Sequence, residues 1–148
     1  MKEIGGYFGI EQGTGRSEFY PSLIKLNLGR NALLYVLRAK KIHKIYLPYY
    51  LCDSVLLICK KENIEPEFYQ IDSNFLPIFD KTLKNDEVLY VVNYFGQINN
   101  RFVKKLSNRY KNIILDNVQS FFQKPLNHID TITIKEIRNN LQKNREKI

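Results

Sequence analysis

The sequence predicts an α/β protein with a mainly parallel sheet, arranged as three α/β/α layers. Short apolar runs at 88–92 and 113–115 indicate buried parallel strands. Segments with apolar residues at helical spacing lie between such runs, as at 100–110. Strands that alternate with amphipathic helices imply crossover connections, so we expect a sheet that helices cover on both faces.

The remaining elements follow from the same patterns. Residues 32, 33, 36 and 37 are apolar at helical spacing, which predicts a helix that begins close to Asn31. Proline and several polar residues predict an irregular stretch at 73–87. We also expect a helix at 53–62 and strands at 44–47, 66–71 and 131–134.

Three segments differ in composition. Residues 1–22 are rich in glycine and aromatic residues. The glycines neither follow a strand nor open a helix, as a dinucleotide-binding motif requires, so this segment does not match that motif. We expect an extended N-terminal arm instead. Residues 23–134 carry the predicted α/β domain. Residues 135–148 are polar and basic, which predicts a frayed, solvated helix or a disordered tail.

Composition narrows the class of protein. The chain has 148 residues, of which 44% are hydrophobic and 26% charged, as in an ordinary globular domain. It contains no run of eighteen apolar residues and no apolar signal region near its start, so we expect a cytoplasmic protein that does not span a membrane. Cys52 and Cys59 with two histidines form no recognisable metal site, and we expect both thiols to face the core.

The net charge of +8 raises the question of nucleic-acid binding. The basic residues are scattered along the chain, and no known nucleic-acid-binding signature occurs. Nucleic acid therefore ranks as an unlikely partner, supported by charge alone.

Asp116 is the first candidate site residue. It follows the apolar run 113–115 directly, and open α/β sheets bind their ligands at the carboxyl ends of their strands. A carboxylate at the edge of an apolar sheet is costly to desolvate unless a donor or a positive group meets it. Asp116 either meets such a group on a ligand or simply caps the next turn.

Gly29 and its neighbours form the second candidate. A glycine at the start of a helix lets a ligand approach the backbone closely, and the first helical N–H groups can hold a phosphate. The alternative is an ordinary glycine-containing turn in which Asn31 caps the helix.

Four motifs occur together in a familiar order: 29–33, the loop after Pro48, 93–96 and 116–119. In this order they resemble the N-terminal half of the large domain of DegT/DnrJ/EryC1/StrS-type sugar aminotransferases. The resemblance covers roughly residues 1–133. It implies part of a pyridoxal-phosphate-dependent transferase domain of the aspartate aminotransferase fold.

The resemblance implies a set of cofactor-binding residues. Asp116 matches the family's aspartate that pairs with the protonated pyridine nitrogen, which makes the ring a better electron sink. Gln119 matches the glutamine near the phenolic oxygen. The turn at Gly29, with the amides of Arg30 and Asn31, matches the phosphate-binding turn.

The chain departs from the family pattern near the cofactor. Leu28 stands where the family usually has a serine whose hydroxyl binds the phosphate. Cys52 aligns with the aromatic residue that stacks on the pyridine ring in many members, and Tyr49 or Tyr50 is a possible substitute.

The catalytic lysine is the largest departure. Ile137 aligns with the position of the Schiff-base lysine, where a dehydratase branch has histidine, and Lys135 lies two residues away. The family's glycine-rich loop and C-terminal domain have no counterpart in the chain. Without that lysine no group forms the covalent link to the cofactor. We therefore expect a truncated member with no catalytic residue of its own and no aminotransferase activity.

Partners are also implied only by the resemblance. Full-length relatives use a nucleotide sugar and an amino donor in making amino sugars for surface polysaccharides, and they act as dimers. A homodimer is therefore expected here. The alternative from another class is a non-enzymatic α/β module that binds itself or a partner protein through exposed apolar surface.

Overall fold

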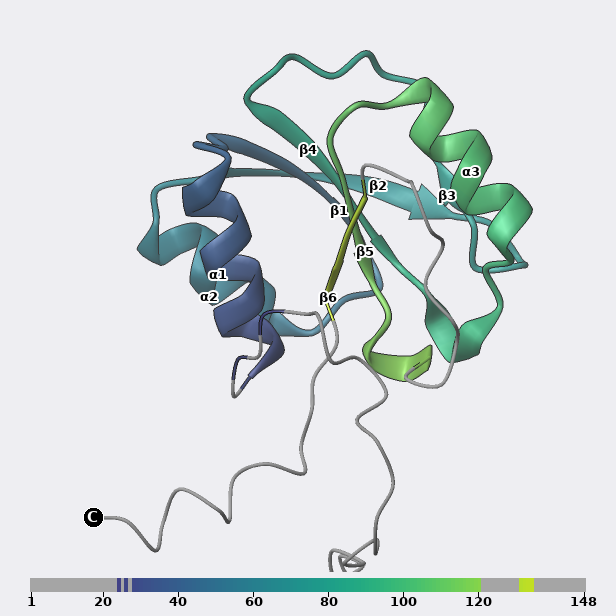
Figure 1. Cartoon of the computed structure of the whole chain (residues 1–148), viewed down its shortest axis with the longest axis horizontal. Coiled ribbons are helices and arrows are strands. Elements are labelled where there is room, and N and C mark those ends of the chain that lie inside the picture. Colours follow the sequence, from purple (N-terminus) through teal and green to yellow (C-terminus); the bar gives the residue numbers. More distant parts are fainter. Residues whose placement is uncertain (1–23, 25, 27, 121–130, 135–148) are drawn as a thin grey trace, which may run out of the picture.

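One sheet organises the chain. The computed structural model describes residues 24, 26 and 28–120, together with the backbone of 131–134. The strands lie in the order β3-β2-β1-β4-β5-β6, and all neighbours are parallel except the antiparallel pair β2 and β3 (Figure 1). The predicted α/β class with a mainly parallel sheet is confirmed.

The elements agree closely with the sequence-based expectations. The helices are α1 (Gly29–Ala39), α2 (Asp53–Lys61) and α3 (Asn100–Arg109). The strands are β1 (Lys44–Pro48), β2 (Glu65–Ile71), β3 (Pro77–Ile78), β4 (Glu87–Val92), β5 (Ile113–Asp116) and β6 (Thr131–Ile134). Two short 3₁₀ turns, η1 (Tyr94–Gly96) and η2 (Val118–Ser120), follow β4 and β5.

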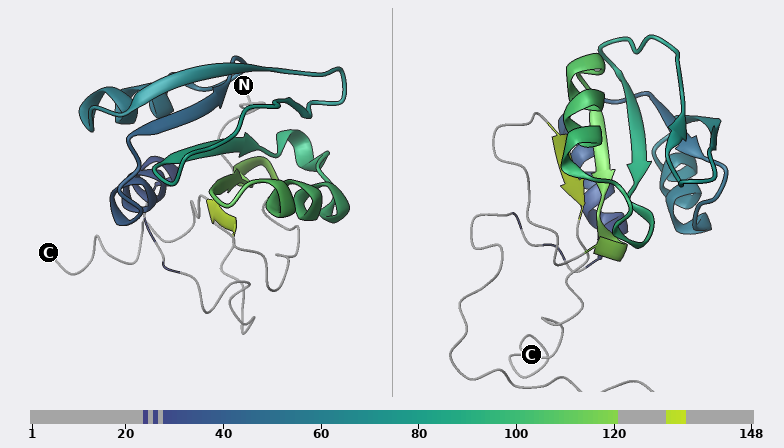
Figure 2. Two further views of the ribbon diagram at one scale, coloured as in Figure 1. Left: turned by 90° about the horizontal axis from the view of Figure 1, so that it is seen from above. Right: turned by 90° about the vertical axis from the view of Figure 1, so that its right-hand side faces the viewer.

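Helices cover both faces of the sheet. Helices α1 and α2 lie on one face and α3 on the other (Figures 1 and 2). Side chains of β4 alternate between the two layers, because successive residues of a strand point to opposite faces. Val88, Tyr90 and Val92 pack with α1 and α2, whereas Leu89 and Val91 pack with α3.

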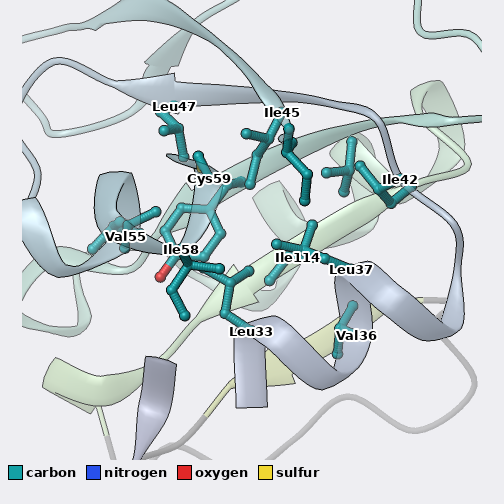
Figure 3. Packing of buried hydrophobic residues seen from close by; sticks show 14 of the residues in the cluster. Leu33, Val36, Leu37, Ile42, Ile45, Leu47, Val55, Ile58, Cys59 and Ile114 are labelled. Atoms are coloured by element: carbon teal, nitrogen blue, oxygen red, sulfur yellow. The ribbon is translucent and has the colours of Figure 1, made fainter. Parts of the chain in front are cut away.

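The first of these two layers holds the larger cluster of buried side chains. Leu33 and Leu37 of α1 are each 1% exposed and meet Ile114 of β5, while Cys59 of α2 packs against the same cluster (Figure 3). This packing holds α1 against the sheet, and the N-terminus of α1 lies close to the carboxyl ends of β4 and β5.

The strand order reverses between β1 and β4. From β1 the chain crosses through α2 to β2 on one side, and it later returns to β4 and crosses through α3 to β5 on the other. Such a reversal leaves a crevice at the carboxyl ends of the two central strands, where α/β proteins bind ligands.

Two expectations from the sequence are wrong. The stretch 73–87 is not irregular throughout, because Pro77–Ile78 pairs with the end of β2 and Glu87 already belongs to β4. Cys52 does not face the core: it is exposed and precedes the first residue of α2, whereas Cys59 is buried as expected. Cys52 lies in the loop before α2, which begins at Asp53 as the sequence predicts, and its thiol is therefore not on the buried face of that helix.

Some expectations fall outside the described residues. The predicted arm at 1–22 and the tail at 135–148 both do so, and the domain at 23–134 is described only in part. None of the helices among the described residues has the length and hydrophobicity that a membrane-spanning segment needs.

Candidate functional site

A pocket of about 520 Å³ lies at the carboxyl edge of the sheet. Its walls come from the N-terminus of α1, the loop between β1 and α2, and the ends of β4 and β5. Five of the six residues predicted for the cofactor site line it: Gly29, Arg30, Cys52, Asp116 and Gln119. The fold therefore gathers residues that are up to 90 positions apart in the sequence (119 − 29).

Asp116 sits at the end of β5, where the backbone register pairs it with Val92 of β4. Its Oδ1 atom accepts the N–H of Val118 at 2.9 Å, and its Oδ2 atom accepts the hydroxyl of Tyr90. The interpretation of Asp116 as a turn cap is confirmed, whereas its contact with a ligand stays a prediction. The carboxylate caps the turn that follows β5, and it also lines the pocket.

Tyr90 is a site residue that the sequence did not reveal. It is 2% exposed, and its hydroxyl reaches Asp116 from within the sheet. Burial, followed by the negative charge of Asp116, raises the pKa of Tyr90 well above its ordinary value. The hydroxyl therefore stays protonated and donates to the carboxylate.

The N-terminus of α1 forms another part of the pocket wall. Residue Leu28 precedes the helix, and its carbonyl oxygen accepts the N–H groups of Asn31 and Ala32 at 3.0 and 3.1 Å. The N–H groups of Gly29 and Arg30 have no carbonyl partner in the helix, since the first N–H groups of any α-helix lack one. These two amides and the Arg30 side chain give this end a positive potential.

Asn31 departs from both interpretations of the glycine turn. The helix begins at Gly29, so Asn31 lies inside its first turn and is not the cap. It is also not among the residues that line the pocket. Its N–H group, expected to face a phosphate, points along the helix to Leu28 instead.

Gln119 connects the two turns beside the pocket. Its Oε1 atom accepts the N–H of Phe95 at 3.1 Å, which joins η2 to η1. Nearby, the buried side chain of Asn93 donates to Asn117 at 3.0 Å. Gly96 adopts a φ of +73°, where a side chain would be strained, and an added Cβ would lie 3.3 Å from Ser120 Oγ. The motifs 93–96 and 116–119 thus form one unit.

Cys52 lies at the mouth of the pocket, directly before α2. The hydroxyl of Ser54 donates to its sulfur at 3.3 Å, and this bond, with a backbone bond from the same residue, lowers the pKa of the Cys52 thiol. Of the two tyrosines proposed as substitutes for the missing aromatic, Tyr50 lines the pocket, whereas Tyr49 stacks on Phe68 at 5.2 Å.

Tyr94 fixes this loop to the sheet. Its hydroxyl donates to the carbonyl oxygen of Tyr50, and the two rings lie 5.4 Å apart. Burial, the neighbouring Tyr50 and the charge of Asp116 raise the pKa of Tyr94 to about 12. The loop between β1 and α2 therefore has a defined position beside the pocket.

Comparisons with known proteins support the fold. A DegT/DnrJ/EryC1/StrS aminotransferase from Brucella abortus superposes with a TM-score of 0.50 and 18% sequence identity, over 64% of this chain and 30% of that one. The resemblance expected from the four motifs is confirmed for the fold. The chain spans about 30% of the length of this aminotransferase.

A second solved structure, a candidate aminotransferase from Burkholderia pseudomallei, matches with a TM-score of 0.44 and 10% identity, over 60% of this chain and 29% of that one. No family model matches the sequence, and no curated protein matches it either. The evidence for the site therefore comes from its own geometry.

The structure adds Tyr90, Tyr94 and Ser54 to the predicted site. Their side chains reach the pocket through strand pairing and loop packing, which sequence spacing does not reveal. One signal was available for Tyr90, because strand alternation puts it on the same face as Val92. That Tyr90 lies near Asp116 follows only once Val92 is known to pair with Asp116 on the neighbouring strand.

The two cysteines give a test of the pocket wall. We expect iodoacetamide at neutral pH to modify Cys52 in the folded protein and to leave the buried Cys59 unmodified, as measured by peptide mass spectrometry. Ser54→Ala removes a bond that stabilises the thiolate, so it should slow modification of Cys52 roughly threefold. Ser107→Ala, on the distant helix α3, is the control and should change nothing. Equal modification of both cysteines would contradict this geometry.

Proposed function

We propose that this chain is a partial aminotransferase-like domain that binds a phosphorylated pyridine cofactor of the pyridoxal type and has no aminotransferase activity on its own. One observation carries the proposal. Asp116 at the end of β5 and the N-terminus of α1 line the same pocket.

The charged and polar groups that line the pocket suit such a molecule. The amides of Gly29 and Arg30 with the Arg30 guanidinium favour an anion such as phosphate. Asp116 favours a protonated ring nitrogen. Apolar side chains that line the same pocket, among them Leu33 and Val55, provide surface for an aromatic ring.

The size of the pocket agrees with this ligand class. Small-molecule pockets measure roughly 300–1,000 Å³, and this one measures about 520 Å³. When bound, pyridoxal phosphate supplies an electron sink for reactions at the carbon that carries an amino group. Asp116 would hold the proton on its ring nitrogen, and Gln119 lines the same pocket from the turn after β5.

The proposed lack of activity rests on the missing lysine. The described residues that line the pocket include no lysine. Ile137, at the expected lysine position, and Lys135 both lie outside the described residues. The proposal extends, by resemblance alone, to a cytoplasmic relative of amino-sugar-forming enzymes whose full-length members use a nucleotide sugar and an amino donor.

Binding is tested with pyridoxamine 5′-phosphate, which cannot react with lysine. We expect saturable binding in calorimetry and protection of Cys52 from iodoacetamide. Asp116→Asn removes the charge that meets the ring nitrogen and should weaken binding roughly tenfold to a hundredfold. The matched control is Asp86→Asn, which changes an exposed aspartate paired with His43 far from the pocket and should leave binding unchanged. The proposal is refuted if the wild-type protein does not bind pyridoxamine 5′-phosphate and this ligand does not protect Cys52 from iodoacetamide.

Inactivity has its own test. We incubate the protein with pyridoxal phosphate, reduce it with borohydride and map the modified lysines by mass spectrometry. We expect a low, scattered modification of surface lysines, and the same pattern of modification in the Asp116→Asn variant. We also expect no conversion of the cofactor when glutamate is added. A single adduct at Lys135 that depends on Asp116 would show that the tail reaches the pocket, and the proposed inactivity would be wrong.

A second candidate function is a module that associates with itself. It is favoured by exposed aromatic side chains near the pocket: Tyr49, Tyr50 and Phe95 are 63%, 61% and 63% exposed. Exposed aromatic surface often marks a protein–protein contact. Phe95 also has a φ of 51°, so the fold holds this ring outward in an uncommon backbone conformation.

Light scattering distinguishes this candidate from a monomeric binding domain. We expect a dimer mass for the wild-type chain and a shift toward monomer in the double variant Tyr49→Ser and Tyr50→Ser. The control Tyr35→Ser changes an exposed tyrosine of α1, 51% accessible, and should keep the wild-type mass. A monomer at all concentrations in the wild type would eliminate self-association.

A further inference from the structure

We propose that Tyr90 is a positioning residue that keeps Asp116 an ionised hydrogen-bond acceptor, so that the pocket selects ligands whose aromatic ring carries a nitrogen-bound proton. This inference rests on the proposed function and deepens it. It concerns a buried tyrosine that neither the four motifs nor the aligned site residues include.

The register of β4 and β5 brings the two side chains together. Tyr90 pairs with Ile114, and Val92 pairs with Asp116, so Tyr90 lies two residues behind the carboxylate on the neighbouring strand. Both Tyr90 and Ile114 face the layer of α1 and α2. A tyrosine is long enough to span this offset, and its hydroxyl ends at Asp116 Oδ2.

Tyr90 is itself held in place. Its backbone carbonyl oxygen accepts the hydroxyl of Tyr69 at 2.8 Å, and its ring is packed in the cluster beneath α1. It is 2% exposed, so its hydroxyl has little access to water as an alternative partner. The tyrosine therefore acts as a fixed donor aimed at the edge of the pocket.

Both carboxylate oxygens receive a donor from the protein: Val118 N–H to Oδ1 at 2.9 Å and Tyr90 O–H to Oδ2. Donors to a carboxylate stabilise its charged form and fix its orientation. Each carboxylate oxygen can accept two hydrogen bonds, so the same group can also accept one from a ligand. An ionised acceptor attracts a ring N–H and repels the lone pair of an unprotonated ring nitrogen.

No other carboxylate occurs among the described residues that line the pocket. Among the described residues that line the pocket, the other titratable groups are Arg30 from α1, Cys52 and Tyr50 from the loop after β1, and Tyr94 from η1. Tyr69 of β2 lies behind Tyr90. Since Arg30 is the cation among them, the local potential also favours an ionised Asp116.

The test uses pyridoxamine 5′-phosphate labelled with ¹⁵N in the ring, at a pH where the free ligand is a mixture of ring-protonated and unprotonated forms. Bound to wild-type protein, the ring nitrogen should show the chemical shift of the protonated form. Tyr90→Phe should weaken binding about tenfold and move that shift toward the unprotonated form, because one charge-stabilising donor is lost.

Tyr69→Phe is the matched control. It also removes one buried tyrosine hydroxyl bond, but that bond ends on a backbone carbonyl and not on Asp116. We expect its ¹⁵N shift to equal that of the wild type. If Tyr90→Phe changes stability alone and keeps the wild-type affinity and shift, Tyr90 has only a structural role and the inference is wrong.

A measurement without ligand separates this inference from the proposed function. In protein labelled with ¹³C at aspartate carboxyl groups, Tyr90→Phe should move the titration midpoint of Asp116 to higher pH, and Tyr69→Phe should not. If the variant fails to fold, wild-type protein labelled at tyrosine Cζ gives the same answer: the Tyr90 signal should shift as Asp116 titrates. Failure of the wild type to bind ligand refutes the proposed function and ligand selection, whereas an unchanged midpoint or an unresponsive Tyr90 signal refutes the positioning role.

Discussion

The carboxylate at the end of β5 is the constraint on which the site depends. A charged group at the edge of an apolar sheet has to be compensated, and here two donors from the protein provide this: the N–H of Val118 and the hydroxyl of Tyr90. One donor orients the turn after β5, and the other connects the carboxylate to the centre of the sheet. The turn after β5 and the orientation of the Asp116 carboxylate are therefore fixed by the same two hydrogen bonds.

Strand β4 makes this arrangement possible. It is buried along its whole length, pairs with both β1 and β5, and sends alternate side chains into the two helical layers. The strand order reverses beside it, so its carboxyl end opens into the crevice. A single strand thus contributes the core of both layers, the tyrosine that holds Asp116, and, through η1, the tyrosine that holds the loop after β1.

The sequence predicted features that depend on local pattern. Apolar runs located β4 and β5, helical spacing located α1 and α3, and the order of four motifs located five of the six predicted residues at one pocket. It did not predict features set by tertiary contacts. The role of Tyr90 depends on the register between two strands, and the exposure of Cys52 depends on how the loop before α2 packs. The short strand β3 exists only because β2 offers it a partner.

The distribution of the site along the chain separates binding from covalent chemistry. The amides at the start of α1, Cys52, Tyr90 and Asp116 all lie within residues 29–116, on elements that the sheet and α1 hold in place. The aligned position of the Schiff-base lysine comes after β6 and carries isoleucine. Recognition of a ring and a phosphate needs only the first group of residues, because it uses charge and hydrogen bonds that the folded sheet already orients. Under the proposed function, this chain would keep the complementarity of a cofactor site without the group that makes the cofactor react.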